Sequence, residues 1–243
     1  MCDACGCGDS NVVPVALSER VLAANDRGAR HNREHFHDHG VIAVNLMGGP
    51  GAGKTAILEA SAQALAALGE AEKVGVLAGD LATDHDAARV RAAGILAESI
   101  TTGSACHLDA EMVHRGLHRL AWRSLDFLFI ENVGNLVCPA VYDLGQDANV
   151  VALSVTEGED KPLKYPTMFR KADLVLLTKT DLLPQLPEID VDRIAANLSM
   201  VMPKPAMITM SVRTGEGIDQ WIQWLHGLKH SRATMRGSIV GAV

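Results

Sequence analysis

Seven short apolar runs recur along the chain from residue 41 onward, and amphipathic, alanine-rich segments separate them. Apolar runs that alternate with helical segments are typical of β–α units around a largely parallel sheet. The runs predict strands at 41–47, 73–79, 94–100, 126–132, 149–155, 173–179 and 206–212. The segments between them predict helices at about 54–68, 84–93, 109–123, 190–200 and 216–228. The fold class is therefore α/β.

The two ends of the chain differ from this pattern. Residues 1–40 combine a cysteine-rich start with a stretch, ALSERVLAANDRGARHNREHFHDHG, that suits a helix, and we interpret them as an N-terminal arm. The last residues show no helical or strand period, which predicts a flexible tail at 231–243. Residues 41–230 remain as a single α/β domain.

Composition removes several classes of function. The net charge of −7 and a pI near 5.8 argue against nucleic-acid binding, which normally needs a basic face. No apolar run is long enough to span a membrane, and the start of the chain lacks the pattern of a signal peptide. We therefore expect a cytoplasmic protein with no membrane contact, in which grouped cysteines are metal ligands or catalytic groups more often than disulfides.

The stretch GGPGAGKT, residues 48–55, follows the first predicted strand and opens the first predicted helix. It fits G-x-x-x-x-G-K-[ST], the P-loop pattern, in which backbone N–H groups at a helix N-terminus surround phosphate oxygens. Lys54 would reach the β- and γ-phosphates, and Thr55 would offer its hydroxyl to Mg²⁺. The fold is therefore predicted to be that of a P-loop NTPase. The expected nucleotide contacts in this stretch are Gly48, Gly51, Ala52, Gly53, Lys54, Thr55 and Ala56.

Two acidic residues stand at the ends of predicted strands. Glu131 ends the strand in DFLFIEN, and Asp80 ends the strand after the P-loop helix. The carboxyl ends of parallel strands meet at one edge of the sheet, so both carboxylates are expected to act on Mg²⁺ or its waters. Together with Lys54 they form the predicted catalytic set.

The stretch LLTKTD indicates which nucleotide base the protein binds. Lys179 and Asp181 match the last two positions of N-K-x-D, and an aspartate accepts hydrogen bonds from two neighbouring guanine donors that adenine lacks. Thr178 replaces the asparagine of that pattern. Ser211, at the end of the last predicted strand, is expected near the guanine oxygen. GTP is thus favoured over ATP.

Cysteines and histidines suggest a metal. Cys106 and His107 follow one predicted strand and Cys138 follows another, so their loops should open on the P-loop edge of the sheet. Two thiolates and an imidazole suit Zn²⁺ or Ni²⁺. A cysteine–histidine nucleophile pair is the rival interpretation, but no acyl-transfer signature accompanies it.

The opening MCDACGCG contains Cys2, Cys5 and Cys7. A redox C-x-x-C normally begins a helix after a strand, and no strand precedes residue 2, so metal binding is favoured, with Ni²⁺, Zn²⁺ and Cu⁺ all open. The four histidines of HNREHFHDHG, at positions 31, 35, 37 and 39, are interpreted as a solvated polar end of the arm, with weak metal binding as the alternative.

Five stretches taken together resemble the HypB family, the nickel-insertion GTPases that help to mature nickel–iron hydrogenases. They are MCDACGCG, GGPGAGKT, GDLATDHDAARV, TTGSACHLDAEMV and FIENVGNLVCPA, and the resemblance spans about residues 1–230. It implies a tight nickel site at Cys2, Cys5 and Cys7. It also implies a weaker nickel or zinc site at Cys106, His107 and Cys138, at a homodimer interface that depends on GTP or metal.

The resemblance also implies partners, namely a nickel chaperone and the large subunit of the hydrogenase. A urease-type nickel-insertion GTPase, a P-loop small-molecule kinase and a metal-storage protein are the alternatives. The urease-type GTPases carry a Cys-x-His motif, whereas Cys106 and His107 are adjacent here, which favours the hydrogenase branch.

Overall fold

The core of the molecule is a seven-stranded, wholly parallel sheet. The computed structural model describes residues 15–67, 73–80, 85–103 and 105–240. The strand order is β3-β2-β4-β1-β5-β6-β7, which places β1, the strand before the P-loop, near the middle. The strands are β1 (Ile42–Gly48), β2 (Val74–Asp80), β3 (Leu96–Thr101), β4 (Phe127–Glu131), β5 (Ala148–Ser154), β6 (Leu174–Thr178) and β7 (Met207–Thr209).

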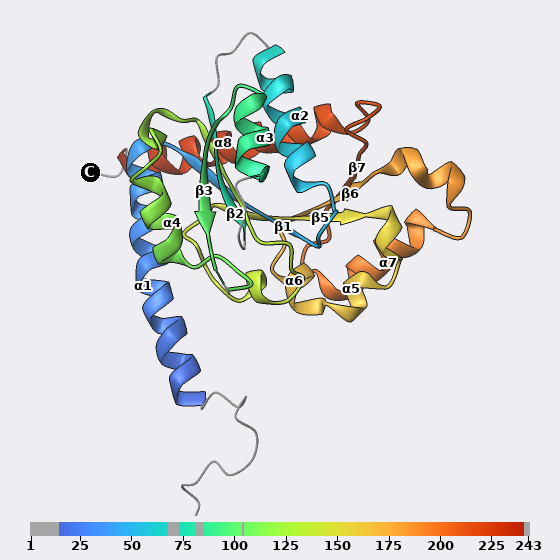
Figure 1. The fold of residues 1–243 in the computed structure, drawn as a ribbon, viewed down its shortest axis with the longest axis horizontal. Coiled ribbons are helices and arrows are strands. Elements are labelled where there is room, and N and C mark those ends of the chain that lie inside the picture. Colours follow the sequence, from blue (N-terminus) through green and yellow to red (C-terminus); the bar gives the residue numbers. More distant parts are fainter. Residues whose placement is uncertain (1–14, 68–72, 81–84, 104, 241–243) are drawn as a thin grey trace, which may run out of the picture.

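Helices cover both faces of this sheet (Figure 1). On one face lie α2 (Lys54–Ala67), α3 (His85–Ala92) and α8 (Ile218–Val240); on the other lie α1 (Val15–His39), α4 (Ala110–Leu117), α5 (Lys161–Lys164), α6 (Pro166–Arg170) and α7 (Val191–Val201). Short 3₁₀ turns occupy Trp122–Ser124, Cys138–Ala140, Val155–Glu157 and Thr180–Gln185. No helix in the described ranges has the length and apolar composition needed to cross a bilayer.

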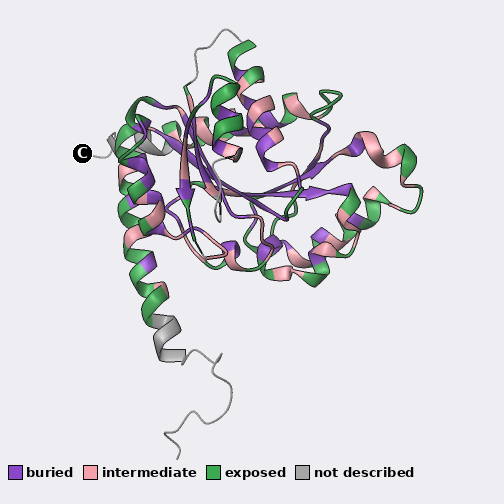
Figure 2. Ribbon diagram, in the orientation of Figure 1, coloured by how far each residue is buried: buried purple, intermediate pink, exposed green. Residues whose placement is uncertain are grey.

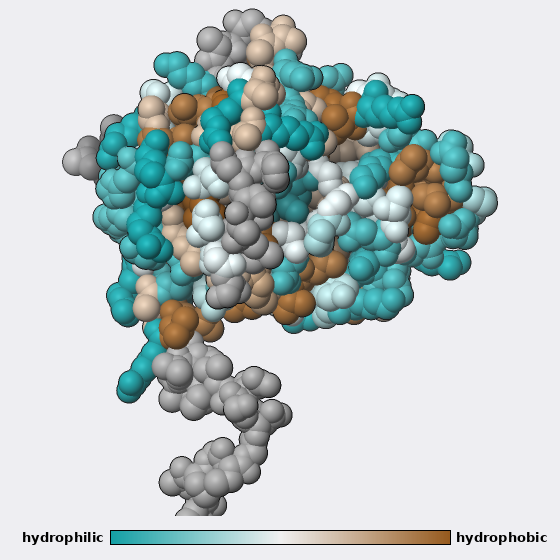
Figure 3. All heavy atoms as spheres, in the orientation of Figure 1, coloured by the Kyte–Doolittle hydropathy of each residue, from teal (hydrophilic) through white to brown (hydrophobic). Residues whose placement is uncertain are grey.

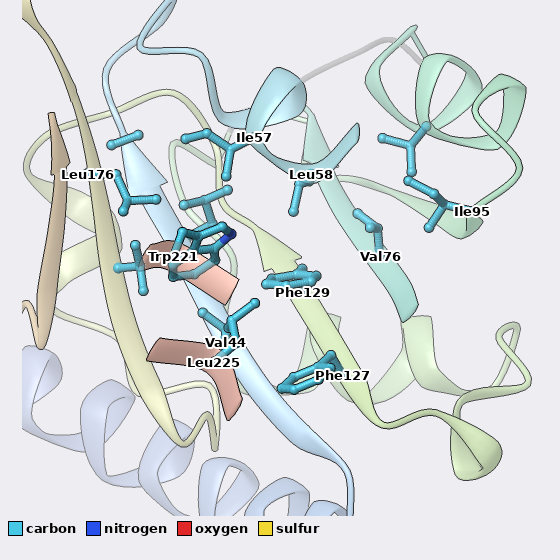
Figure 4. Packing of buried hydrophobic residues seen from close by; sticks show 14 of the residues in the cluster. Val44, Ile57, Leu58, Val76, Ile95, Phe127, Phe129, Leu176, Trp221 and Leu225 are labelled. Carbon is cyan, nitrogen blue, oxygen red and sulfur yellow. The ribbon is translucent and has the colours of Figure 1, made fainter. Parts of the chain in front are cut away.

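Burial follows this layering, with the inner strands almost wholly buried, the edge strands β3 and β7 partly buried, and the outer helix faces exposed (Figure 2). One apolar cluster joins β1 and β4 to α2 and α8, and Figure 4 shows Phe127, Phe129 and Trp221 within it. The indole N–H of Trp221 donates to Ser61 Oγ over 2.8 Å, so the polar atom of this buried ring is satisfied. Continuous apolar runs such as β5 are thus explained by burial on both faces.

Helix α1 packs against the domain through α4. Asn25 Oδ1 accepts from the backbone N–H of Ala110 (2.9 Å), and Asn32 Nδ2 donates to the carbonyl of the same residue (2.8 Å). Phe36 is fully buried in the apolar cluster beneath α4. The part of the predicted arm from Asn25 to Phe36 is therefore helical, as expected, and is packed on the body. The domain boundary at residue 40 stays a prediction.

Four helices differ from those that the sequence pattern predicts. Helix α4 begins where its N-cap Asp109 accepts from Met112 N (2.7 Å) but ends at Leu117, short of 123. Helix α8 continues to Val240, so the expectation of no regular structure after residue 230 was wrong for the described residues. The short helices α5 and α6 were not predicted, because four or five residues give too little period to recognise.

Candidate functional site

The loop between β1 and α2 has the backbone geometry of a phosphate site. Gly51 and Gly53 adopt φ angles of 76° and 97°, left-handed values that favour glycine. A Cβ on Gly48 would overlap the backbone oxygen of Ala152 on the neighbouring strand. The loop therefore brings backbone N–H groups to the start of α2, where the helix dipole favours an anion.

Lys54 and Thr55 line a cavity of about 530 Å³ together with Gly51, Gly53 and Ala56. Lys54 Nζ donates to the carbonyls of Gly48 and Gly49, each over 3.3 Å. Burial lowers the pKa of Lys54, and the neighbouring carboxylates, Glu131 first among them, oppose that change. The ammonium thus rests on P-loop carbonyls, which phosphate oxygens could replace.

Glu131, the last residue of β4, lies in the wall of the same cavity and is only 3% exposed. Its Oε1 accepts from Thr55 Oγ1 over 2.9 Å, whereas its Oε2 is buried without a hydrogen-bond partner. Burial raises the pKa of Glu131 to about 7, against the lowering effect of Lys54. A buried carboxylate oxygen that lacks a partner, beside a threonine hydroxyl, fits the oxygen-ligand chemistry of Mg²⁺.

Asp86, which the sequence analysis did not select, provides the second carboxylate at this cavity. Its Oδ1 lies 3.1 Å from Thr55 Oγ1, and the residue lies in the first turn of α3. Asp80 ends β2 in register with Thr101, at the edge of the sheet where it was expected, but its side chain lies outside what the structure describes. The stretch GDLATDHDA holds three aspartates, and sequence position alone does not tell which one faces Thr55.

A second cavity, of about 320 Å³, adjoins the P-loop on the side of β6. Asp181 lies in its wall and accepts a hydrogen bond from Ser211 Oγ over 2.7 Å. Lys179, also in the wall, is the one non-glycine residue of the described ranges with a positive φ, 61°. Such a strained conformation recurs at ligand sites. The structure thus brings Lys179, Asp181 and Ser211 together beside Gly53 and Ala56.

Thr178 performs a structural task at the same place. Its hydroxyl donates to the carbonyl of Ala52 in the P-loop over 2.7 Å, and it is buried. The residue that departs from N-K-x-D therefore still connects the end of β6 to the phosphate loop.

Cys106, His107 and Cys138 converge as the sequence pattern predicts. One donor atom from each lies within 4.8 Å of the other two. The two sulfur atoms are 2.8 Å apart, and Cys106 Sγ is 3.8 Å from His107 Nδ1. The ring of His107 stacks on Tyr142 with 3.8 Å between centroids, which fixes its orientation. These three residues form a possible metal site.

The protonation of this group suits a metal. Burial lowers the pKa of His107, which favours the neutral imidazole that binds metals. The contact with Cys106, and then burial, raise the pKa of Cys138. Ionisation of Cys138 to the thiolate is consequently unfavourable unless a cation is nearby, and a bound metal ion would be that cation.

A short polar path joins this metal group to the phosphate cavity. Asn132 directly follows Glu131, and its Oδ1 accepts from the backbone N–H of Leu108 over 3.0 Å. Leu108 directly follows His107. Asn132, which follows Glu131, is therefore hydrogen-bonded directly to Leu108, which follows His107.

The remaining predicted ligands have different outcomes. Cys2, Cys5 and Cys7 lie outside the described residues. Of the four histidines in the arm, His31 and His35 lie against His114 of α4, whereas His39 packs on Trp122 and His37 lies beside Asp38.

Comparison with known proteins decides the family. The model of a family described as the CobW/HypB/UreG nucleotide-binding domain matches residues 42–209. The hydrogenase maturation factor HypB of Escherichia coli strain K12 is 48% identical over 228 residues, covering 90% of this chain and 77% of its own length. The chain belongs to the HypB family.

Solved structures agree with this assignment. HypB from Archaeoglobus fulgidus is 41% identical with a TM-score of 0.78, over 86% of this chain and 100% of its own. HypB from Helicobacter pylori, solved in complex with nickel, is 39% identical with a TM-score of 0.80, over 86% of this chain and 96% of its own. The predicted α/β P-loop fold is confirmed, and the body of this HypB-family chain is a nucleotide-binding GTPase domain.

Proposed function

We propose that this chain hydrolyses GTP and uses the hydrolysis to control a nickel ion that is delivered to a nickel–iron hydrogenase during its maturation. The observation that carries the proposal is the path from Glu131 through Asn132 and Leu108 to His107. A change at the phosphate cavity can move the metal group along this path, because the loop after β4 lines the cavity and carries Cys138. The same loop is hydrogen-bonded through Asn132 to Leu108, the residue next to His107. Two-state loops of this kind convert hydrolysis into a change elsewhere.

In the phosphate cavity, Lys54 and the backbone N–H groups of the loop would hold the β- and γ-phosphates. Thr55, Glu131 and the acidic residues Asp80 and Asp86 are the candidates to hold Mg²⁺, whose chemistry is to neutralise charge on the phosphate oxygens. With its pKa raised to about 7, Glu131 would lose its proton to water more readily with Mg²⁺ held nearby, and the ionised carboxylate would offer Oε2 as a ligand. Water then attacks the γ-phosphorus, and the bond to the bridging oxygen breaks to give GDP and phosphate.

In the second cavity, Asp181 would accept from the two guanine donors while Ser211 holds its carboxylate in place. The aliphatic stem of Lys179 would lie along the base. GTP is therefore the proposed nucleotide.

Two metal sites are proposed for the cargo. Cys106, His107 and Cys138 would hold Ni²⁺ or Zn²⁺ in a state that depends on the nucleotide, and Cys2, Cys5 and Cys7 would form the tighter nickel site. We also expect a homodimer that depends on GTP or metal, with a nickel chaperone and the hydrogenase large subunit as partners. These assignments rest on the family relationship and on the donor chemistry.

Metal titrations test the proposal. Nickel binding and dimerisation would be measured with GDP and with a non-hydrolysable GTP analogue on three chains: the wild type, Cys106→Ala, and a variant with Cys2, Cys5 and Cys7 changed to alanine. We expect Cys106→Ala to lose the weaker equivalent and its dependence on nucleotide, and the triple variant to lose only the tighter one. Wild-type behaviour of Cys106→Ala in both nucleotide states would contradict the coupled site.

A further inference from the structure

The facing sides of α1 and α4 carry a second cluster of possible metal ligands, separate from the cysteine sites. His31 and His35 are one turn apart on α1, and His114 on α4 is four residues before His118, the C-cap of that helix. One donor atom from each of His31, His35 and His114 lies within 4.8 Å of the others. Residues four apart on a helix present their side chains to the same side, which is how two imidazoles reach one ion.

The distances between the imidazoles suit a shared ion. The Nε2 atoms of His31 and His35 are 3.0 Å apart, and those of His114 and His118 are 3.2 Å apart. Two nitrogens that each lie about 2.0–2.1 Å from one metal are separated by roughly 2.8–3.4 Å in planar or tetrahedral geometry. The ring centroids of His31 and His114 are 5.1 Å apart, so the two helices already bring their imidazoles together.

A polar atom in the cluster lacks a partner. His114 Nδ1 is the one imidazole nitrogen of the described residues that is buried without a hydrogen bond. Buried polar atoms are usually satisfied, and each exception needs an explanation. A bound ion would satisfy this cluster, whose donors are all imidazoles and include no carboxylate or thiol.

Hydrogen bonds between α1 and α4 fix the relative position of the two helices that carry the histidines. Asn25 and Asn32 hold both backbone groups of Ala110, the first residue of α4, and Asn32 is adjacent to His31. The relation between the two helices is therefore fixed by buried hydrogen bonds that do not involve the histidines. The outer surface over α1 and α4 is largely hydrophilic (Figure 3). His31 is exposed and His35 and His114 are half-buried, so an ion has access from solvent.

From this geometry we infer that His31, His35 and His114 form a third metal site for a borderline divalent ion such as Zn²⁺ or Ni²⁺, with His118 at its edge. Three protein ligands with an open position are typical of sites that exchange a ligand, whereas structural sites are closed by four. The ion would thus keep one position open for water or another ligand. His107 lies three residues before α4 begins at Ala110, and His114 lies within that helix, so the two groups are close along the chain.

The test uses the full chain with all five cysteines changed to serine, which removes the thiol ligands. We expect this chain to bind one equivalent of Zn²⁺ or Ni²⁺, and His31→Ala or His114→Ala to weaken that binding at least about tenfold, the lower end of what loss of even an outer-shell partner costs. His37→Ala, on the same helix but outside the cluster, is the matched control and should bind as its parent does.

A second measurement uses the wild-type chain, in case the chain without cysteines does not fold. Imidazole nitrogen NMR signals with added Zn²⁺ should shift for His31, His35 and His114 and stay unchanged for His37. If His114→Ala binds like its parent, or if only the signals of His31 and His35 respond, no site joins the two helices. Signals that shift at His107 alone would equally overturn the inference.

Discussion

Replacing Glu131 with glutamine should remove a pH-dependent penalty on the folded state. Burial raises the pKa of this carboxyl from an ordinary 4.5 to about 7, so the folded protein binds more protons than the unfolded chain between these values. The free energy of unfolding must then fall as pH rises through that window. At about 1.4 kcal/mol for each pH unit, the full loss is about 3 kcal/mol.

Glutamine retains the shape of the side chain and an oxygen that accepts from Thr55, but it does not ionise. The unfolding free energies of wild type and Glu131→Gln, measured in urea without nucleotide or Mg²⁺, should therefore change relative to each other by about 2–3 kcal/mol from pH 5 to pH 8, in favour of the variant at high pH. Other titrating groups such as Lys54 affect the unfolding free energy of both proteins, so taking the difference between wild type and variant largely cancels their contribution. Glu188→Gln, on an exposed loop, should follow the wild type. A constant difference between wild type and Glu131→Gln across this range would refute the reasoning.

Three further predictions concern the nucleotide cavities. Lys54→Ala should abolish GTP hydrolysis, measured as phosphate release, while nickel still binds to the arm; equal loss of both would argue against separable sites. Asp181→Asn should weaken GTP and favour xanthosine triphosphate in competition binding, because an amide donates where xanthine offers a carbonyl; efficient ATP hydrolysis by the wild type would contradict the guanine assignment. Thr178→Val should weaken nucleotide affinity by about 0.5–1.5 kcal/mol through loss of the hydrogen bond to Ala52, whereas Thr178→Ser should bind like the wild type.

The sheet and the P-loop could be predicted because their signals are local. A strand buried on both faces shows as a run of apolar residues, and the glycines of the phosphate loop meet backbone requirements within eight residues. The convergence of Cys106, His107 and Cys138 also followed from topology, since parallel strands end at one edge.

Other features depend on contacts that no local pattern records. The second half of α8 is held by ion pairs from Lys229 to Asp126 and from Arg232 to Asp147, each 2.9 Å, and these partners are distant in sequence. Asp86 contacts Thr55 because α3 packs against α2, which spacing along the chain does not indicate. The histidines of the arm were grouped by sequence, whereas the fold separates His31 and His35 from their neighbours and adds His114.

The docking of α1 determines where the chain can be shortened. A protein that began at Val41 would keep every strand but would lose Phe36 from its buried position, which by analogy with Phe→Ala substitutions costs about 3–5 kcal/mol. It would also leave both backbone groups of Ala110 without their asparagine partners, at the start of the helix that follows the metal group. The free energy of unfolding of a native domain is only about 5–15 kcal/mol. The smallest fragment that folds with full stability should accordingly begin before Asn25. A fragment that begins at the first strand would be less stable than the full chain.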